Sequence, residues 1–405
     1  MVSNQYFKVF NYLLFVYLNY FKKIRLKSHN FVFYLKLMSL PTVTFAKNHN
    51  AEFYKTLQSR VREYFKENNL SRYANSGMVI KTIFMISLYV TPFILMNTII
   101  TTTWVSFLMW IVMGLGMAGV GLSIMHDANH GAYSKNDRIN KLLGLVINGV
   151  GGSDVNWRIQ HNVLHHTYTN VTGMDEDINP GFLMRFTPHA KRLKYHKYQH
   201  FYAWFFYGMM TLMWCTVKDF VQAKRFKGQD LLKTQNITYS RLVRNIIITK
   251  VLYFTIVLGL PFFFSTLPWY GIILGFLSMH FVAGLVLAAI FQPAHVIPSS
   301  TYPVPNESGE VEADWAVNQL YNTANFAPKS TWFSWYVGGL NFQVEHHLFP
   351  NISHVHYKKL SKIVENTAKE YNLPYFSFNT FYGALKEHTK MLRDLGTKDF
   401  APGIH

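Results

Sequence analysis

The sequence predicts an all-α integral membrane protein with four transmembrane helices in two hairpins and a helical cap on the cytoplasmic side. Composition is the first reason, because 50% of the residues are hydrophobic and only 15% are charged, against about 25% charged in ordinary soluble domains. The second reason is a set of four long apolar stretches. The third is eight histidines in short clusters outside those stretches, which the cap would hold together as a histidine-rich site for two metal ions.

The four stretches are long enough to cross a hydrocarbon core as helices, which takes about 20 apolar residues each. They cover residues 82–100, 104–124, 246–265 and 270–291. The short loop within each pair carries no Lys or Arg, whereas the long segment between the pairs carries many. By the positive-inside rule, both hairpins therefore enter the bilayer from the cytoplasm, and every histidine cluster lies on that face.

The remaining segments are assigned by composition. Residues 1–37 form an N-terminal extension that matches a signal peptide poorly, and we expect it to be dispensable, with Met38 as an alternative start. Residues 38–75 are expected to be a cytoplasmic segment, and residues 76–405 to be the membrane domain. The apolar segment 201–217 is short and rich in Trp and Tyr, so we expect it to lie at the interface rather than to cross.

The charge and the cysteine content of the chain argue against several classes of function and metal site. The net charge is +18, and its uneven placement between apolar spans favours membrane orientation over nucleic-acid binding. Cys215 is the only cysteine, which excludes disulfides, cysteine-ligated iron–sulfur clusters and cysteine-type zinc sites. Any metal must then be bound by imidazole, carboxylate or amide groups.

The histidine clusters have the spacing of metal ligands. They are HDANH (His126, His130), HNVLHH (His161, His165, His166), a single His295 in FQPAHV, and QVEHH (Gln343, His346, His347). Residues four apart share a helix face, so His126 and His130 are expected to bind one metal or to bridge toward two. His161 and His165 repeat that spacing, and His166, about 100° further round an α-helix, would address a second metal.

Eight imidazoles suit two metals of higher coordination better than one tetrahedral zinc. The carboxylate bridges of soluble di-iron bundles are missing. Two non-haem irons are therefore the predicted cofactor, with zinc as the alternative and dioxygen as co-substrate. The amide oxygen of Gln343 is a candidate for a weak ligand or for holding a bound water.

These motifs resemble those of the membrane fatty acid desaturase family, whose signature is HxxxH, HxxxHH and a third HxxHH or QxxHH box. The glutamine that heads the third box resembles the front-end subgroup, which places a double bond between an existing one and the carboxyl end. The resemblance covers about residue 76 to the C-terminus. It implies a fatty acyl substrate, contact with membrane lipid, and His295 as a ligand beside the seven histidines of the boxes.

The resemblance also implies an electron donor. Many front-end members carry a fused cytochrome b5 domain with an HPGG motif, which is missing from this sequence. We therefore expect a separate ferredoxin or cytochrome b5, and favour a bacterial inner membrane over the endoplasmic reticulum. Basic residues between the hairpins could steer an acidic donor or could contact anionic lipid: Lys191, Arg192, Lys194, Lys197, Lys224, Arg225 and Lys227.

Supporting residues are predicted around the boxes. Asp127, Asp175 and Asp177 are candidates to accept a hydrogen bond from a metal-bound histidine, with helix capping as the alternative role. An apolar tunnel entered from the cytoplasmic side would hold the acyl chain. Its candidate wall residues, for which ordinary core packing is the alternative, are Trp157, Trp315, Asn318, Trp332, Trp335 and Phe342.

Two other functions stay open at this stage. The same scaffold could hydroxylate lipids or oxidise carotenoids. A b-type haem electron carrier is the alternative from another class, but it needs histidines in mid-span on facing helices. His280 is the only histidine in such a position and has no obvious partner in the sequence.

Overall fold

Four helical segments of the described residues, 43–46 and 51–400, are long and apolar enough to cross a membrane in this computed structural model. Two of them are unbroken α-helices, and two are interrupted by a π-helical stretch. They are α3 (Ser76–Thr98), Thr103–Asn129 (α4 Thr103–Gly119, η2 Val120–Ile124, α5 Met125–Asn129), Tyr239–Phe264 (α12 Tyr239–Tyr253, η8 Phe254–Gly259, α13 Pro261–Phe264) and α14 (Trp269–His295). The predicted spans are thus confirmed as helices. The prediction that residues 1–37 are a dispensable extension concerns a segment outside the described residues.

The helices extend beyond the apolar runs from which they were predicted. Helix α3 begins six residues before its predicted start, and α12 begins seven residues before its own, because polar side chains cap both helices. Asn75 accepts a hydrogen bond from the amide of Met78 at 3.0 Å, and Thr238 accepts one from Arg241 at 3.4 Å. At the other ends, the second span continues to Asn129 and α14 continues to His295. The histidine clusters at 126 and 295 therefore lie on rigid helices continuous with the spans.

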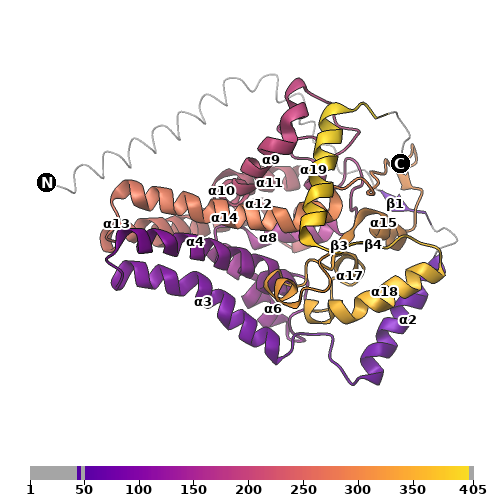
Figure 1. The fold of residues 1–405 in the computed structure, drawn as a ribbon, viewed down its shortest axis with the longest axis horizontal. Helices are drawn as coiled ribbons and strands as arrows, with labels where there is room; N and C mark the ends of the chain where they lie inside the picture. The colour runs from indigo at the N-terminus through magenta and orange to yellow at the C-terminus, as the bar shows by residue number, and fades with distance from the viewer. Residues whose placement is uncertain (1–42, 47–50, 401–405) are drawn as a thin grey trace.

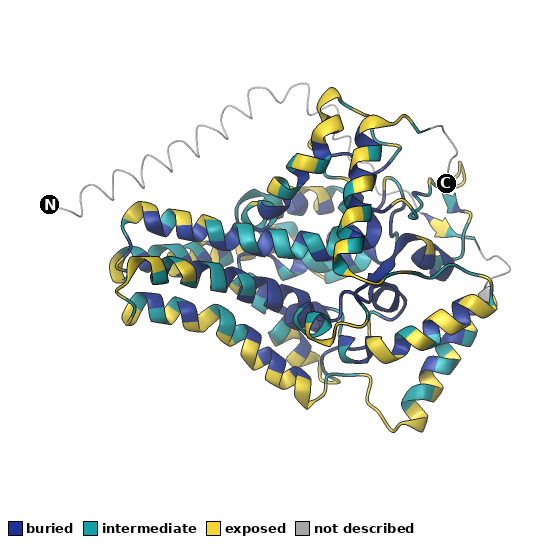
Figure 2. Cartoon of the chain, viewed as in Figure 1, coloured by how far each residue is buried: buried dark blue, intermediate teal, exposed yellow. Residues whose placement is uncertain are grey.

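The spans form a bundle whose outward faces are apolar (Figure 1). Ile80 is 67% exposed, Ile83 is 62% exposed and Val251 is 58% exposed. Such a density of exposed apolar side chains on helices is typical of contact with lipid. Figure 2 shows the contrast with α17 (Gln343–Leu348), all of whose residues are buried.

The remaining helices form the cap and the segment that joins the two pairs of spans. Between the pairs lie α6 (Asp137–Gly144), α7 (Val146–Gly149), α8 (Asp154–Trp157), η3 (Arg158–His165), η4 (Glu176–Ile178), η5 (Lys194–Tyr198), α9 (Gln199–Gly208), α10 (Met210–Met213), η6 (Trp214–Lys218), α11 (Asp219–Gly228) and η7 (Leu231–Gln235). The others are α2 (Ala51–Glu67), α15 (Trp315–Asn322), α16 (Thr331–Tyr336), α17, η9 (His354–His356), α18 (Tyr357–Glu370) and α19 (Phe381–Thr397).

Two short parallel strand pairs are the exceptions to the expected all-α fold. Strand β1 (Thr44–Phe45) pairs with β2 (Glu310–Val311), and β3 (Ala324–Phe326) pairs with β4 (Phe376–Phe378). Each pair joins segments far apart in the sequence and is too short for an alternating apolar pattern to show it. Their role is local, since they fix the loops around α15 and α17.

Helix α2 packs against α18 in the cap. Phe53, Leu57 and Val61 of α2 share one buried core with Leu360 and Val364 of α18. The apolar positions of α2 recur every four residues, which is the period of one helix face. The segment before the first span therefore adds to the core beneath the third histidine cluster.

The apolar segment 201–217 is broken into short pieces rather than forming one long helix. Helix α9 ends at Gly208, α10 runs for four residues, and η6 follows as a π-helical turn. These pieces pack along α14 at small residues. A Cβ atom on Gly284 would lie 2.6 Å from the carbonyl oxygen of Gly208 and 2.7 Å from that of Tyr207. Only glycine allows this close approach of α9 to α14.

We predict that Gly284→Ala destabilises the protein by about 1–3 kcal/mol, because the added methyl group overpacks the contact between α9 and α14. Thermal unfolding of the purified protein in detergent measures the change. The matched control is Gly149→Ala, where a Cβ atom meets nothing within 4 Å. Equal melting temperatures for the two variants would contradict the assigned contact.

Candidate metal centre

Four chain segments bring the eight predicted histidines together. His126 lies on α5 and His130 caps it, His161 and His165 lie on η3, and His166 is the cap of η3. His295 ends α14, and α17 provides His346 and His347. All are buried except His130, which is partly buried. The structure thus gathers residues from four clusters spread over more than half of the chain.

The histidines divide into two groups with a shared member. The ligand atoms of His126, His130, His161 and His346 all lie within 4.8 Å of one another, and so do those of His165, His295 and His347. His166 joins the two groups, because its Nε2 lies 2.9 Å from that of His346 and 3.2 Å from that of His161. It also forms a cluster of its own with His346 and His347. Two adjacent positions for metal ions result.

The second cluster differs from its predicted geometry because its helix is a π-helix. The amide of His166 donates to the carbonyl of His161 at 2.9 Å, a bond that spans five residues. In an α-helix His161 would align with His165, as the sequence predicted, whereas here it aligns with His166. His165 therefore joins His295 and His347, while His161 joins the first group. One short segment in this way provides ligands to both groups.

The inward nitrogens form a donor set that fits metal ions. The Nε2 atoms of His130, His165, His295 and His347 are buried and have no hydrogen-bond partner. Buried polar atoms are nearly always satisfied, so four orphaned nitrogens on one centre require a ligand. Imidazole nitrogen is a good donor to iron, copper, nickel and zinc. Gln343 adds a buried Oε1 atom without a partner.

The charge state of the histidines also suits metal binding. Burial, with neighbouring histidines adding, holds the pKa of His161, His166 and His346 well below the ordinary value of 6.5. The pKa values of His130 and His347 are lowered for the same reasons. These side chains are neutral at pH 7, which is the form that binds metal.

The outward nitrogens are held by oxygen atoms. Nδ1 of His165 lies 3.0 Å from Oδ2 of Asp175, and Nδ1 of His347 lies 2.9 Å from Oε1 of Gln319. Nδ1 of His295 bonds the carbonyl of Asn322 at 3.0 Å, and Nδ1 of His346 lies 3.3 Å from the Tyr357 hydroxyl. An acceptor at Nδ1 keeps the proton there and leaves the Nε2 lone pair free for a metal.

The three predicted supporting carboxylates have different placements. Asp175 contacts His165 and also caps η4, so both roles weighed for it are present. Asp177 lies 3.6 Å from Nδ1 of His165 and accepts a short hydrogen bond from Gln160. Burial lowers the pKa of His165, but the charges of Asp175 and Asp177 outweigh this and leave it raised.

Asp127 departs from the prediction. Its Oδ2 lies 2.9 Å from Nδ1 of His354 and 2.8 Å from the hydroxyl of Ser353, not beside a histidine of the centre. Asp127 directly follows His126 on α5, so its side chain points about 100° away from the ligand face. It fixes η9 against the second span instead.

Sequence reasoning missed Gln319, Asn322 and Tyr357 as supports of the ligands. Gln319 and Asn322 are three apart on α15, a spacing that places them on one helix face. The polar side chains that recur along α15 were the available signal, but the sequence favoured Asn318, one residue earlier, for a place beside the tunnel.

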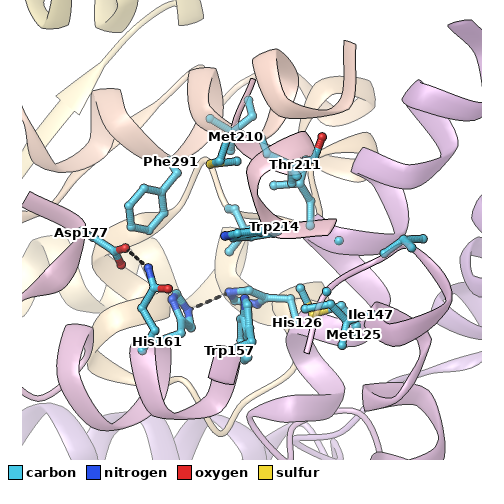
Figure 3. A pocket seen from close by; sticks show the side chains of 18 of the residues that line it. Met125, His126, Ile147, Trp157, His161, Asp177, Met210, Thr211, Trp214 and Phe291 are labelled. Atoms are coloured by element: carbon cyan, nitrogen blue, oxygen red, sulfur yellow. Dashed lines mark hydrogen bonds between the residues drawn. The ribbon is translucent and has the colours of Figure 1, made fainter. Parts of the chain in front are cut away.

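A cavity of about 120 Å³ adjoins the first group of histidines. It lies between the spans and the broken segment α9–η6, and its walls are mostly apolar, as in Met117, Leu287 and Phe291. Figure 3 shows His126, His161 and Trp157 along one side, with Met210 and Trp214 facing them. The metal-facing nitrogens therefore border a narrow apolar space.

Of the predicted tunnel residues, Trp157 alone lines this cavity. The indole of Trp315 donates to the carbonyl of His166 at 3.2 Å and packs on Tyr54, and Asn318 donates to the carbonyl of Thr169 at 3.0 Å. The others pack elsewhere: Trp335 on Phe84, Trp332 on Tyr336, and Phe342 in the cap core with Phe53. A tunnel role for these five stays a prediction, since they pack away from the cavity that lies between the spans.

His280 is not free to bind haem. Its Nε2 lies 2.8 Å from the hydroxyl of Tyr253, and its Nδ1 lies 3.1 Å from that of Thr211. Both ring nitrogens are thus engaged by hydroxyl groups. The mid-span histidine that a haem carrier would need is instead a hydrogen-bonded core residue.

Comparison with known proteins agrees with this geometry. The family model described as fatty acid desaturase matches residues 102–379. The chain is 35% identical over 355 residues to an sn-1 linoleoyl-lipid 6-desaturase of Arthrospira platensis, covering 87% of this chain and 94% of that protein. It is also 35% identical over 364 residues to an acyl-lipid (8-3)-desaturase of Physcomitrium patens, covering 89% of this chain and 75% of that protein. A third relative, an sn-1 linoleoyl-lipid 6-desaturase of Synechocystis, is 33% identical over 350 residues, with 85% and 95% covered.

We predict that Asp175→Asn lowers iron affinity about 10- to 100-fold, the usual cost of removing a partner of a metal-bound histidine. Asparagine keeps the size but loses the charge that orients His165. Iron bound per chain, measured by elemental analysis after dialysis against a graded chelator series, reports the change. Asp137→Asn on the exposed face of α6 is the control, and equal iron retention in both variants would refute the role of Asp175.

Proposed function

Because this chain belongs to the fatty acid desaturase family, and is an oxidoreductase of lipid metabolism, we propose that it is a front-end acyl desaturase acting on unsaturated chains such as linoleoyl groups. The double bond would be placed between an existing one and the carboxyl end. Relatives named as 6-desaturases and (8-3)-desaturases support this position. The glutamine at the head of the third cluster, Gln343, agrees with it.

One observation carries the proposal. His126, His161 and His346 belong to the candidate metal centre and also line the apolar cavity between the spans. A desaturase must hold one carbon pair of a featureless chain beside its metals, and the barrier falls when the reacting groups are held together. The cavity provides that position without any polar group of its own having to recognise the reacting carbons.

The proposed cofactor is a pair of non-haem irons. His126, His130, His161 and His346 would hold one iron, and His165, His295 and His347 the other, with His166 between them and Gln343 as a weak or water-mediated contributor. When bound and reduced, the irons would use dioxygen to remove two hydrogens from neighbouring methylene groups. The protein's own part is to keep the imidazoles neutral, fixed and dry.

The cavity walls orient the chain and exclude water. Trp157 and Trp214 face each other across the cavity (Figure 3), and Met117, Leu287 and Ile290 continue the apolar wall. An acyl chain that enters buries its methylene groups at a gain of about 0.8 kcal/mol each. Water is thereby displaced from the space beside the ligands.

We further propose the predicted topology and partners. Two helical hairpins would enter from the cytoplasm, with the metal centre on that face, and a bacterial inner membrane is favoured over the endoplasmic reticulum. Electrons would come from a ferredoxin or cytochrome b5. The exposed Lys191, Arg192, Lys194 and Lys197 support docking of an acidic donor.

We predict that a host fed linoleate and expressing the full chain accumulates a fatty acid with one new double bond on the carboxyl side of the existing pair. Mass spectrometry of derivatised fatty acids gives its position. His346→Ala, which removes one ligand, is expected to abolish the product, whereas Lys135→Ala, at an exposed position, should not. A hydroxylated product, or a product that persists in His346→Ala, would overturn the proposal.

A further inference from the structure

Two polar groups in the wall of the cavity have no partner. The ammonium of Lys218 forms no hydrogen bond or ion pair with any described residue, and its nearest defined contact is the ring of Trp214, with the centroid at 5.0 Å. The Oε1 atom of Gln292 is buried and also unpartnered. Both groups therefore have hydrogen-bonding capacity available to a ligand that enters the cavity, Lys218 as a donor and Gln292 Oε1 as an acceptor.

The acidic neighbours of Lys218 are engaged elsewhere. Its ammonium feels the charges of Asp177, Glu176 and Asp219. Asp177 accepts a hydrogen bond from Gln160, Glu176 lies 2.7 Å from Arg225, and Asp219 lies 2.7 Å from Lys250. Each carboxylate has another partner, so the donor capacity of Lys218 remains available.

The cavity also has polarity along its length. Asp177 lies at one end in Figure 3, and Met125 and Ile147 lie at the other, with His126 and His161 between. Lys218 belongs to the polar end, since it is close enough to Asp177 and Glu176 for their charges to act on it. An acyl chain has the same polarity, with a carbonyl at one end and a methyl group at the other.

We propose that Lys218 binds the carbonyl oxygen of the acyl head and so sets the number of carbons between that head and the metal centre. The inference rests on the proposed function and names the residue that determines its positional specificity. A carbonyl is common to esters and thioesters, so the same contact serves a phospholipid or an acyl-CoA. Counting from this end also gives the front-end position of the new bond.

The test compares four full-length proteins: wild type, Lys218→Met, Lys218→Arg and Lys329→Met. Lys329 is the control because it is an exposed lysine that does not line the cavity. Each protein is expressed with linoleate, and each is then purified with iron and assayed with reduced ferredoxin on linoleoyl phospholipid vesicles and on linoleoyl-CoA. Double-bond position, apparent KM and bound iron are measured.

Lys218→Met is expected to spread the new double bond over neighbouring carbons and to raise the apparent KM about ten-fold or more, as loss of a charge-assisted hydrogen bond predicts. Bound iron should not change, Lys218→Arg should restore the single isomer, and Lys329→Met should match wild type. If Lys218 had only a structural role, Lys218→Met would lower the activity without changing the position of the double bond.

Several results would overturn the inference. One is a single isomer at the wild-type position from Lys218→Met with an unchanged KM. Another is an effect on linoleoyl-CoA alone, which would assign Lys218 to the CoA phosphates rather than to the carbonyl. If Lys218→Met does not accumulate, Lys218→Gln is measured by the same criteria. A wild type that makes no desaturated product would instead refute the proposed function.

Discussion

Eight imidazoles must stay fixed while their inward nitrogens lie close together, and the rest of the structure serves that requirement. The Nε2 atoms of His166 and His346 are 2.9 Å apart, a separation that two imidazolium ions would not tolerate. Burial keeps the pKa of both side chains well below its ordinary value. The cap achieves this by surrounding α17 completely, and the oxygen atoms of Asp175, Gln319 and Asn322 then hold the rings from behind.

Helix geometry allocates the ligands between the two groups. An α-helix aligns residues four apart, and HDANH uses this to place His126 and His130 together. HNVLHH has the same spacing, but η3 is a π-helix, which aligns His161 with His166 and releases His165 to the other group. Similar motifs thus perform different tasks because their backbones differ. The extra residue per turn of the π-helix η3 allows one segment to provide ligands to two metals.

Much of this could be predicted from the sequence, and the failures have physical causes. Apolar length predicted the four spans, and the histidine clusters predicted which residues gather in one centre, but not how His161 and His165 divide between the two groups. Cap residues such as Asn75 are polar and hide the true helix starts from hydropathy. The π-helix was not predictable, because its sequence pattern is that of an α-helix. Aromatic side chains near a motif do not reveal which side of α14 the cavity occupies, and of the predicted tunnel residues Trp157 alone lies in its wall. The sequence does not single out Lys218, since its lack of a hydrogen-bond partner is visible only in three dimensions.

Helix α14 carries out three tasks along one rod: it forms a span, lines the cavity at Ile290 and Phe291, and ends in the ligand His295. A change in its tilt or length would move the wall and the ligand together. The segment α10–η6 lines the opposite wall at Met210 and Trp214 and contributes no histidine to the centre. During evolution, the preference for chain length can therefore change through substitutions in that segment but not through changes in α14. Anyone redesigning this enzyme for a different fatty acid should vary the wall that bears no metal.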